Sequence, residues 1–326
     1  MTSRLRLALV GTGWITGLHL RALDRLDRTT LVGVASRSAD RAAATAARWG
    51  GGSSFDDVGR MLDETRPDVL FVCQPPHLAA AACESAIERG IPFLTEKPLA
   101  ATAADAERVG AMLDGRDLVV AVGYNWRGLD FLPLLREQFA ARPPLLVNAR
   151  WSGGMPPPPW WRHVRESGGQ VVEQATHLYD IARHLVGEAS VVAAASAGGP
   201  RPRHPDADVD LVAGAIVRFD GGAVGTFSNT SIAPSDEIDI EFVSDGGRAT
   251  IAMHPGADGP AWTLTLDDGR GERTIETRRD SYEVQAEAFL DAVVAGDPRR
   301  VLSTYGDALV TDRLTRAVVA AAGSAG

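Results

Sequence analysis

The chain has 326 residues, of which 45% are hydrophobic and 23% charged, so it is long enough for two domains and has the composition of a soluble globular protein. Its formal net charge of −9, with no lysine- or arginine-rich run, argues against a nucleic-acid partner, because phosphate binding requires a basic surface. The chain has no long apolar run, only two cysteines and seven scattered histidines, so we expect a cytoplasmic protein without a membrane span, a disulfide framework or a metal site.

The first predicted strand ends at Val10 and enters a glycine-rich turn, Gly-Thr-Gly-Trp-Ile-Thr-Gly at residues 11–17, before a helix that should start near Leu18. A strand, a glycine turn and a helix start are the context in which such a turn binds a dinucleotide. Gly11 would permit the tight turn, and Gly13 would let the backbone approach a pyrophosphate at the helix N-terminus. The third glycine position carries threonine, and a loop that is merely rich in glycine is the alternative.

The second predicted strand, residues 31–35, ends in Ser36 and Arg37. A dinucleotide-binding fold that prefers NAD usually has an acidic residue at this strand end, where it binds the ribose 2′-hydroxyl. A hydroxyl beside a guanidinium suits a 2′-phosphate instead. The sequence therefore favours NADP(H), with NAD(H) as the alternative, since an exposed loop arginine would leave the same pattern.

Strands and helices then alternate up to residue 122. We expect further helices at 39–49, 58–65, 78–89 and 102–113, and strands at 53–55, 68–73, 92–95 and 118–122. This alternation predicts a parallel, doubly wound sheet, so we assign residues 1–122 to a Rossmann dinucleotide-binding domain.

Polar residues follow two of these predicted strands. Gln74, Pro75 and His77 come after one strand, and Glu96 and Lys97 come after the next. Because ligands bind at the carboxyl ends of parallel strands, both groups are expected beside the cofactor. An exposed surface lysine is the alternative for Lys97.

The second half of the chain opens with Asn125 and Arg127, which are candidate substrate ligands; interdomain hydrogen bonding is the alternative. Further on, the four prolines 156–159 form a stiff segment that ends in Trp160-Trp161-Arg162. Indole faces suit the C–H faces of a sugar or cyclitol, and Arg162 can hydrogen-bond hydroxyl groups. A rigid lid or an interface loop would use the same residues.

A helix is expected in the segment that starts at Ser167, because after a glycine pair it contains neither Gly nor Pro before Gly187. Glu173, His177 and Asp180 are four and three residues apart, which places all three on one helix face. A carboxylate can fix the tautomer of a histidine and hold its pKa near neutrality, so this stripe could transfer protons. A solvated polar face with a half-buried histidine is the alternative.

From about residue 191, short alternating segments are separated by Gly-Gly, Asp-Gly and proline-rich turns. They predict strands at 209–219, 223–231, 237–243, 249–251, 262–266 and 273–277, and a proline-rich loop at 200–208. We assign residues 123–326 to an α+β domain whose mostly antiparallel, open-faced sheet is covered by helices on one side. Tyr282 precedes a helix at 284–295 and is a pocket candidate or a packing residue, and the last helix, at about 304–322, can pack back on the first domain.

These motifs resemble the Gfo/Idh/MocA family of oxidoreductases, named for glucose-fructose oxidoreductase and inositol dehydrogenase. The matching elements, in family order over nearly the whole chain, are Gly11-Thr12-Gly13-Trp14-Ile15, Pro75 with His77, Glu96-Lys97-Pro98, Val122-Gly123-Tyr124-Asn125-Trp126-Arg127, Trp161-Arg162 and the stretch 167–180. Glu-Lys-Pro followed ~25 residues later by Gly-Tyr-x-x-Arg is far more specific than the glycine turn alone.

The resemblance implies that Lys97 hydrogen-bonds the reacting oxygen, where its ammonium would favour alkoxide character or polarise a carbonyl. It also implies that His177 is the general acid/base that moves the hydroxyl proton while hydride moves to or from nicotinamide. Where the family usually has aspartate this chain has Glu173, which either orients His177 or faces another hydroxyl. This departure leaves the substrate open rather than the reaction type.

The expected ligands follow from the motifs and the resemblance together. Expected to bind the cofactor are Gly11, Gly13, Trp14, Ile15, Ser36, Arg37, Gln74, Pro75, His77, Glu96 and Lys97, and expected to bind substrate are Asn125, Arg127, Trp161, Arg162, Asp180 and Tyr282. Because the family commonly pairs the open face of its second sheet with another subunit, the resemblance also implies a homodimer or homotetramer.

The leading hypothesis is an NAD(P)-dependent dehydrogenase or reductase, with NADP favoured, that acts on a secondary alcohol or ketone of a sugar, cyclitol or related polyol. The first alternative is a redox-assisted glycosidase or lyase of the same family, in which bound cofactor oxidises a sugar transiently. The second is a non-catalytic protein that senses dinucleotides, although such a protein has no need for both Lys97 and His177.

Overall fold

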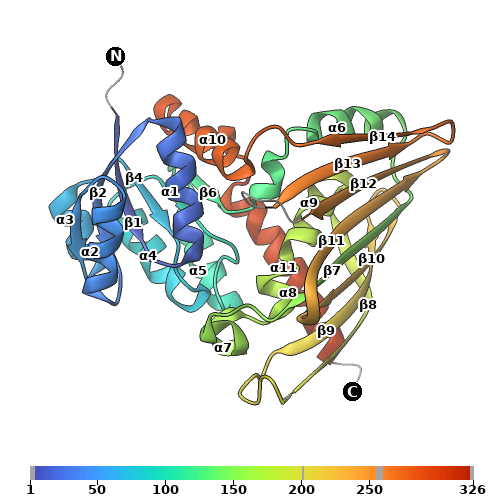
Figure 1. Ribbon diagram of the computed structural model, residues 1–326, viewed down its shortest axis with the longest axis horizontal. Coiled ribbons are helices and arrows are strands. Elements are labelled where there is room, and N and C mark those ends of the chain that lie inside the picture. Colours follow the sequence, from blue (N-terminus) through green and yellow to red (C-terminus); the bar gives the residue numbers. More distant parts are fainter. Residues whose placement is uncertain (1–3, 200–201, 255–259, 324–326) are drawn as a thin grey trace. The chain divides into compact units, whose positions relative to one another are not determined.

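A computed structural model describes residues 4–199, 202–254 and 260–323 (Figure 1). Its contacts divide the chain into two compact units, residues 1–128 with 280–309, and residues 129–279 with 310–326. The chain thus returns to the first unit near its C-terminal end. The proline-rich loop expected at 200–208 lies partly outside the described residues.

The first unit contains a sheet of six parallel strands in the order β3-β2-β1-β4-β5-β6. The strands are β1 Leu5–Val10, β2 Thr29–Ala35, β3 Ser53–Phe55, β4 Val69–Val72, β5 Phe93–Thr95 and β6 Val120–Val122. Most of their side chains are buried, as expected of strands that are covered on both faces. The predicted Rossmann sheet is confirmed, and its strand order reverses between β1 and β4, where sheets of this kind bind their ligands.

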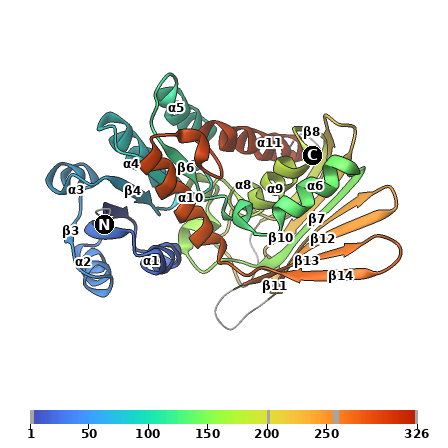
Figure 2. The same ribbon diagram turned by 90° about the horizontal axis from the view of Figure 1, so that it is seen from above.

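Helices cover both faces of this sheet. They are α1 Trp14–Leu26, α2 Ala39–Arg48, α3 Val58–Thr65, α4 Pro76–Glu88, α5 Ala103–Leu113 and α10 Ser281–Ala295. One hydrophobic core joins α1, α2 and α10 to the sheet, and a second core joins α3, α4, α5 and the first turn of α11 (Tyr305–Gly323) to its other face. Figure 2 shows α4 and α5 on the opposite side of the sheet from α1 and α2.

Helix α10 belongs to the first unit although its sequence neighbours belong to the second. Phe289 packs edge-on against Phe71 of β4, with ring centroids 5.6 Å apart. Arg25 of α1 forms ion pairs with Asp280 and Glu283 at the start of α10. These contacts join segments that lie far apart in the sequence, which is why alternation along the chain did not predict them.

The second unit contains a sheet of eight strands in the order β14-β13-β12-β11-β7-β10-β9-β8. The strands are β7 Leu146–Gly154, β8 Ala189–Gly198, β9 Asp210–Phe219, β10 Val224–Thr230, β11 Ile232–Ser244, β12 Gly247–His254, β13 Ala261–Asp267 and β14 Glu272–Glu276. All neighbouring pairs are antiparallel except β7 with β10. The prediction of a mostly antiparallel sheet is confirmed, while strand β8 was not expected.

One face of this sheet carries α6 Leu132–Ala141, α8 Gln170–Glu173 and α9 Thr176–Val186 (Figure 2), and the short helix α7 Val164–Ser167 precedes α8. Tyr179 of α9 stacks on Phe227 of β10 at 4.3 Å between ring centroids, and Phe139 of α6 meets Phe242 of β11 at 5.2 Å. On the other face, side chains such as Arg150 and Ile216 are exposed. Across the described ranges, no helix is both long enough and apolar enough to cross a membrane.

Candidate active site

The glycine turn after β1 forms an uncapped helix N-terminus. Gly11 has φ 101°, and a Cβ atom there would lie 2.2 Å from the carbonyl oxygen of Cys73, so only glycine fits. Gly13 is the N-cap of α1, makes no side-chain capping bond, and would leave a Cβ atom in open space. The first amides of α1 therefore have no side-chain cap, which is the arrangement that binds an anion.

Helix α1 begins at Trp14, earlier than the expected start near Leu18. The turn is shorter than its glycine content suggested, because Gly13 is already the extended N-cap residue. Thr16, at the third glycine position, lies inside the first turn, where its hydroxyl donates to the Gly11 carbonyl at 3.1 Å. Trp14 is 76% exposed and Ile15 packs partly buried against the core of the first unit.

The end of β2 carries hydroxyl and guanidinium groups and no carboxylate. The Ser36 hydroxyl lies 3.3 Å from the Thr12 hydroxyl, and Arg37 is exposed. Arg41, in the first turn of α2, donates to the Thr12 carbonyl at 2.8 Å. Sequence reasoning missed Arg41, although its place one turn after the strand end could have indicated it.

The ends of β4 and β5 lie side by side, because these strands pair in parallel. Gln74 follows β4, and its Oε1 atom is buried with no hydrogen-bond partner among the described residues. Pro75 is the N-cap of α4, and His77 lies in the first turn of that helix. Lys97 follows β5 and is half-buried.

The first unit therefore fits a dinucleotide on its own geometry. The uncapped start of α1 suits a pyrophosphate, and the groups after β2 suit a ribose or its phosphate. The buried Gln74 oxygen needs a donor that the described residues do not supply. The structure thus brings the predicted cofactor residues to one edge of the parallel sheet.

Asn125, Arg127 and Tyr282 are bonded or packed within the first unit. The Asn125 amide donates to the Ser281 hydroxyl at 2.9 Å. The buried Arg127 guanidinium lies 2.5 Å from the Asp307 carboxylate and donates to the Leu302 carbonyl. The Tyr282 ring meets His19 edge-on, and burial followed by the charge of Glu96 raises the pKa of its phenol well above the usual range. All three side chains thus have packing roles, and their contact with substrate stays a prediction.

In the second unit, the predicted polar helix is interrupted. Gly168 and Gly169 have φ of 84° and 90°, left-handed values that favour glycine, and they separate α7 from α8. Helix α8 then ends at Glu173, and α9 begins at Thr176. The single helix expected here was wrong, because the Ala175 amide bonds to the carbonyl of Gln170, five residues back, and breaks the regular repeat.

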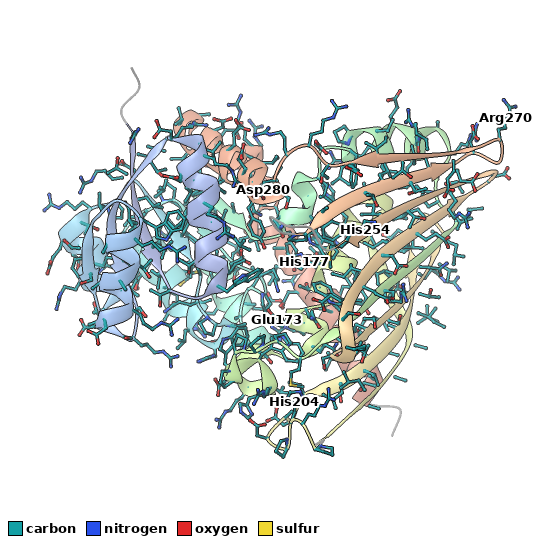
Figure 3. The ribbon with its side chains drawn as sticks, in the orientation of Figure 1. Glu173, His177, His204, His254, Arg270 and Asp280 are labelled. Atoms are coloured by element: carbon teal, nitrogen blue, oxygen red, sulfur yellow. The ribbon has the colours of Figure 1, made fainter. Side chains whose placement is uncertain are left out.

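The two predicted proton-handling residues lie on consecutive helices, Glu173 on α8 and His177 on α9 (Figure 3). The indole Nε1–H of Trp161 donates to Glu173 Oε2 at 2.5 Å. The imidazole of His177 is buried and stacks on the Trp151 ring, with 6.2 Å between centroids. Aromatic side chains therefore hold both groups in place.

Trp161 and Arg162 belong to a structured loop. Trp161 is buried against Ala207, Val209 and Leu211. The Arg162 guanidinium pairs with Asp206 at 3.3 Å, and its carbonyl accepts the Asp208 amide at 3.0 Å. The end of the proline-rich segment is thereby hydrogen-bonded to residues 206–208, which precede β9.

Asp180 points into the packing of the second unit. It is 1% exposed, and its carboxylate accepts a hydrogen bond from the Thr311 hydroxyl of α11 at 3.0 Å. Arg183 donates to the same hydroxyl at 2.9 Å. Asp180 thus has a packing role that Glu173 and His177 do not share. Binding of substrate by Asp180 stays a prediction.

Two family models match successive parts of the chain. Residues 5–124 match the family model described as "Oxidoreductase family, NAD-binding Rossmann fold", and residues 143–251 match the "GFO/IDH/MocA C-terminal domain". The chain is similar to myo-inositol 2-dehydrogenase of Thermotoga maritima, at 25% identity over 93% of this chain and 92% of that protein. It is also similar to levoglucosan dehydrogenase of Pseudarthrobacter phenanthrenivorans, at 28% identity over 75% of this chain and 70% of that protein.

Solved structures show the same fold. A levoglucosan dehydrogenase in complex with NADH and levoglucosan superposes with a TM-score of 0.88 at 23% identity, over 99% of this chain and 98% of that one. KijD10, a 3-ketoreductase from Actinomadura kijaniata in complex with NADP and TDP-benzene, gives a TM-score of 0.85 at 21% identity, over 98% of each chain.

Proposed function

The chain belongs to the Gfo/Idh/MocA family of oxidoreductases, and from that premise we propose that it transfers hydride between NADP(H) and a secondary alcohol or ketone of a polyol. The observation that carries this proposal is that the chain combines an uncapped dinucleotide turn with both Lys97 and the Glu173–His177 pair. A binding protein has no need for a proton relay. Relatives named for myo-inositol and levoglucosan support a sugar or cyclitol as the substrate class.

In the proposed reaction, Lys97 has an electrostatic role and His177 transfers the proton. In oxidation, His177 accepts the hydroxyl proton, and the Lys97 ammonium stabilises the developing alkoxide as hydride leaves the neighbouring carbon. In reduction, Lys97 polarises the carbonyl and His177 returns the proton. Nicotinamide, when bound, would supply the hydride acceptor or donor. Glu173, held by Trp161, orients His177 or binds a second hydroxyl.

These two roles predict how kcat and NADPH binding change when either residue is replaced. Lys97→Met and His177→Asn should each lower kcat by about 10²- to 10⁴-fold, the usual contribution of a positioned proton-transfer or electrostatic group. Binding of NADPH, followed by the fluorescence of the cofactor, should change little in His177→Asn, because the role of His177 concerns the substrate proton alone; Lys97→Met also removes a predicted cofactor ligand and should weaken NADPH binding as well. Retention of more than a third of wild-type kcat in either variant would contradict the assigned roles.

NADP(H) is the favoured cofactor. Ser36, Arg37 and Arg41 can surround a 2′-phosphate, and no carboxylate stands at the end of β2 to bind a free 2′-hydroxyl. Related structures contain either NADH or NADP, so the relatives leave the choice open.

Fluorescence titration with NADPH and NADH tests this preference. Wild type should bind NADPH at least tenfold more tightly than NADH, since a guanidinium contact with a phosphate contributes about 1.5–3 kcal/mol. Arg37→Ala and Arg41→Ala should remove that preference and leave NADH binding unchanged, while Arg108→Ala, an exposed arginine on α5 that pairs with Glu84, serves as the control. Equal affinity for the two cofactors in wild type would overturn the preference for NADP(H).

The open face of the eight-stranded sheet is the proposed subunit interface, in a homodimer or homotetramer. Ile216 of β9 lies beside Thr226 of β10, and Val224 lies beside Arg218, so apolar and polar side chains alternate on an exposed surface. Such a face is expected to be either solvated or paired with a second sheet. We place the assembly in the cytoplasm, where the two free cysteines stay reduced.

A further inference from the structure

A buried histidine lies behind the strand end that carries Lys97. His19 of α1 is 0% exposed, and its Nε2 atom lies 2.6 Å from Oε1 of Glu96. Its ring is enclosed edge-on by Phe71 and Tyr282, at 5.4 and 5.3 Å between centroids. The proposed proton transfer does not use this histidine, and sequence reasoning did not single it out.

The second oxygen of Glu96 continues this contact toward Lys97. Oε2 accepts the backbone N–H of Lys97 at 3.2 Å. The carboxylate also fills the space above Gly123, where a Cβ atom would lie 2.7 Å from Oε2. The glycine that follows β6 is thus needed because the Glu96 carboxylate occupies the place of a side chain.

A buried carboxylate in this position has an energetic cost. Removal of an ion from water is unfavourable unless partners satisfy it, and apolar residues of similar size would often give a more stable core. Burial, and to a smaller extent the charge of Glu96, raises the pKa of Cys73 and of Tyr282 well above their usual ranges. Stability alone therefore does not account for the pair.

We propose that His19 is a positioning residue, which holds Glu96 so that the Glu96 carboxylate fixes the backbone of Lys97. The contact joins α1, the helix of the dinucleotide turn, to the end of β5. The contact therefore connects Lys97 to α1, the helix whose N-terminus is proposed to bind the pyrophosphate. The consequence for catalysis rests on the proposed function, whereas the link itself does not.

Amide hydrogen exchange tests the link without any substrate. In wild type, the Lys97 amide should exchange slowly, because Glu96 accepts its hydrogen. His19→Leu should speed that exchange at least tenfold, and His19→Gln, which keeps an N–H donor, should restore most of the protection. Gly123→Ala should have the effect of His19→Leu from the opposite side, since the new methyl group displaces the carboxylate.

Tyr305→Phe is the matched control for these variants. It removes another buried hydrogen bond of the first unit, from the Tyr305 hydroxyl to the Ala106 carbonyl, and does not touch Glu96. It should lower the melting temperature and leave the protection of the Lys97 amide, relative to other core amides, unchanged. If His19→Leu and Gly123→Ala also leave that relative protection unchanged, the positioning role is overturned.

Kinetics then tests the consequence for the reaction. On a substrate that wild type turns over, His19→Leu should lower kcat about tenfold, which corresponds to ~1.4 kcal/mol, with KM for substrate and Kd for NADPH within about threefold. His19→Gln should recover kcat to within about threefold. A wild type that turns over no polyol refutes the proposed function, whereas an unchanged kcat in His19→Leu refutes the positioning role alone.

Discussion

At the scale of single residues, the proposed chemistry depends on side chains that are held by other side chains. Glu173 accepts the indole N–H of Trp161, and His177 stacks on Trp151. In the first unit, Glu96 is held between His19 and the Lys97 amide. Rigid support of this kind keeps reacting groups in their productive geometry, which is a large part of catalysis by a preorganised site.

The bond from Trp161 to Glu173 predicts a kinetic effect. Trp161→Phe keeps an aromatic ring in the buried site but removes the N–H donor, and it should lower kcat about tenfold, since a hydrogen bond to a charged group contributes about 1.5–3 kcal/mol. The measurement is steady-state kinetics together with the melting temperature. Trp160→Phe, in the neighbouring position without a bond to Glu173, is the control. Equal kcat in wild type and Trp161→Phe would show that the indole only packs.

The buried thiols predict how stability depends on pH. Burial raises the pKa of Cys83 to about 12. The unfolded thiol ionises near its ordinary value, so between that value and 12 the unfolded state binds fewer protons than the folded state, and stability falls as pH rises. Urea unfolding should show that wild type loses about 2 kcal/mol more than Cys83→Ala between about pH 9 and about pH 11. An equal loss in the two proteins would contradict the raised pKa.

Local patterns in the sequence indicated candidate site residues, but they did not indicate which side chains these residues contact. The glycine turn, Lys97 and His177 stand next to recognisable local patterns. His19 lies 77 residues before Glu96, and Arg25 lies 255 residues before Asp280, so no local spacing indicates these pairs. Arg127 was expected near substrate because the motif around it resembles that of the family. Its ion pair with Asp307 depends on tertiary packing and could not be predicted.

At the scale of elements, two consecutive glycines shape the segment that carries Glu173. Gly168 and Gly169 both have left-handed φ, and a side chain there costs roughly 1–2 kcal/mol. Gly168→Ala and Gly169→Ala should each lower the free energy of unfolding by that amount, measured in urea. Gly306→Ala in α11, where φ is not left-handed and a Cβ would meet nothing, should be neutral or stabilising. Equal changes in the free energy of unfolding at all three positions would contradict a specific need for glycine at 168 and 169.

Elements with a clear local pattern were predicted closely. The first strand ends at Val10 as expected, and the strand at Ser53–Phe55 and the helix at Val58–Thr65 have the expected bounds. Strand β8 was missed because Ala189–Gly198 is rich in alanine and serine and shows no apolar alternation. Its side chains are only partly buried, so the strand owes its form to pairing with β9 rather than to its composition.

At the scale of the whole molecule, the sequence predicted only in part which segments of the chain belong to each unit. The switch from alternating helices and strands to hairpins indicated two architectures. The return of α10 to the first unit depends on Phe289 and on ion pairs to Arg25, which are contacts between distant segments. The same limit applies to the parallel pairing of β7 with β10, which alternation within each strand cannot reveal.

The exposed sheet face predicts the state of assembly. Ile216→Asp combined with Val224→Asp should shift the protein toward monomer, because two buried carboxylates would oppose sheet-to-sheet packing. Light scattering after size-exclusion chromatography gives the mass. Val294→Asp, at an exposed apolar position on α10 in the other unit, is the control and should leave the mass unchanged. A wild type that is monomeric at all tested concentrations would refute the proposed interface.

The most direct test of the central claim is the fate of hydrogen from the reacting carbon. A polyol deuterated at its carbinol carbons is incubated with the protein and NADP⁺, and the reduced cofactor is analysed by mass spectrometry. We expect one deuterium in NADPH for each ketone formed, and transfer about 10²- to 10⁴-fold slower with Lys97→Met. Substrate cleavage with deuterium returned to the product, and no net NADPH, would contradict the account and favour a redox-assisted lyase.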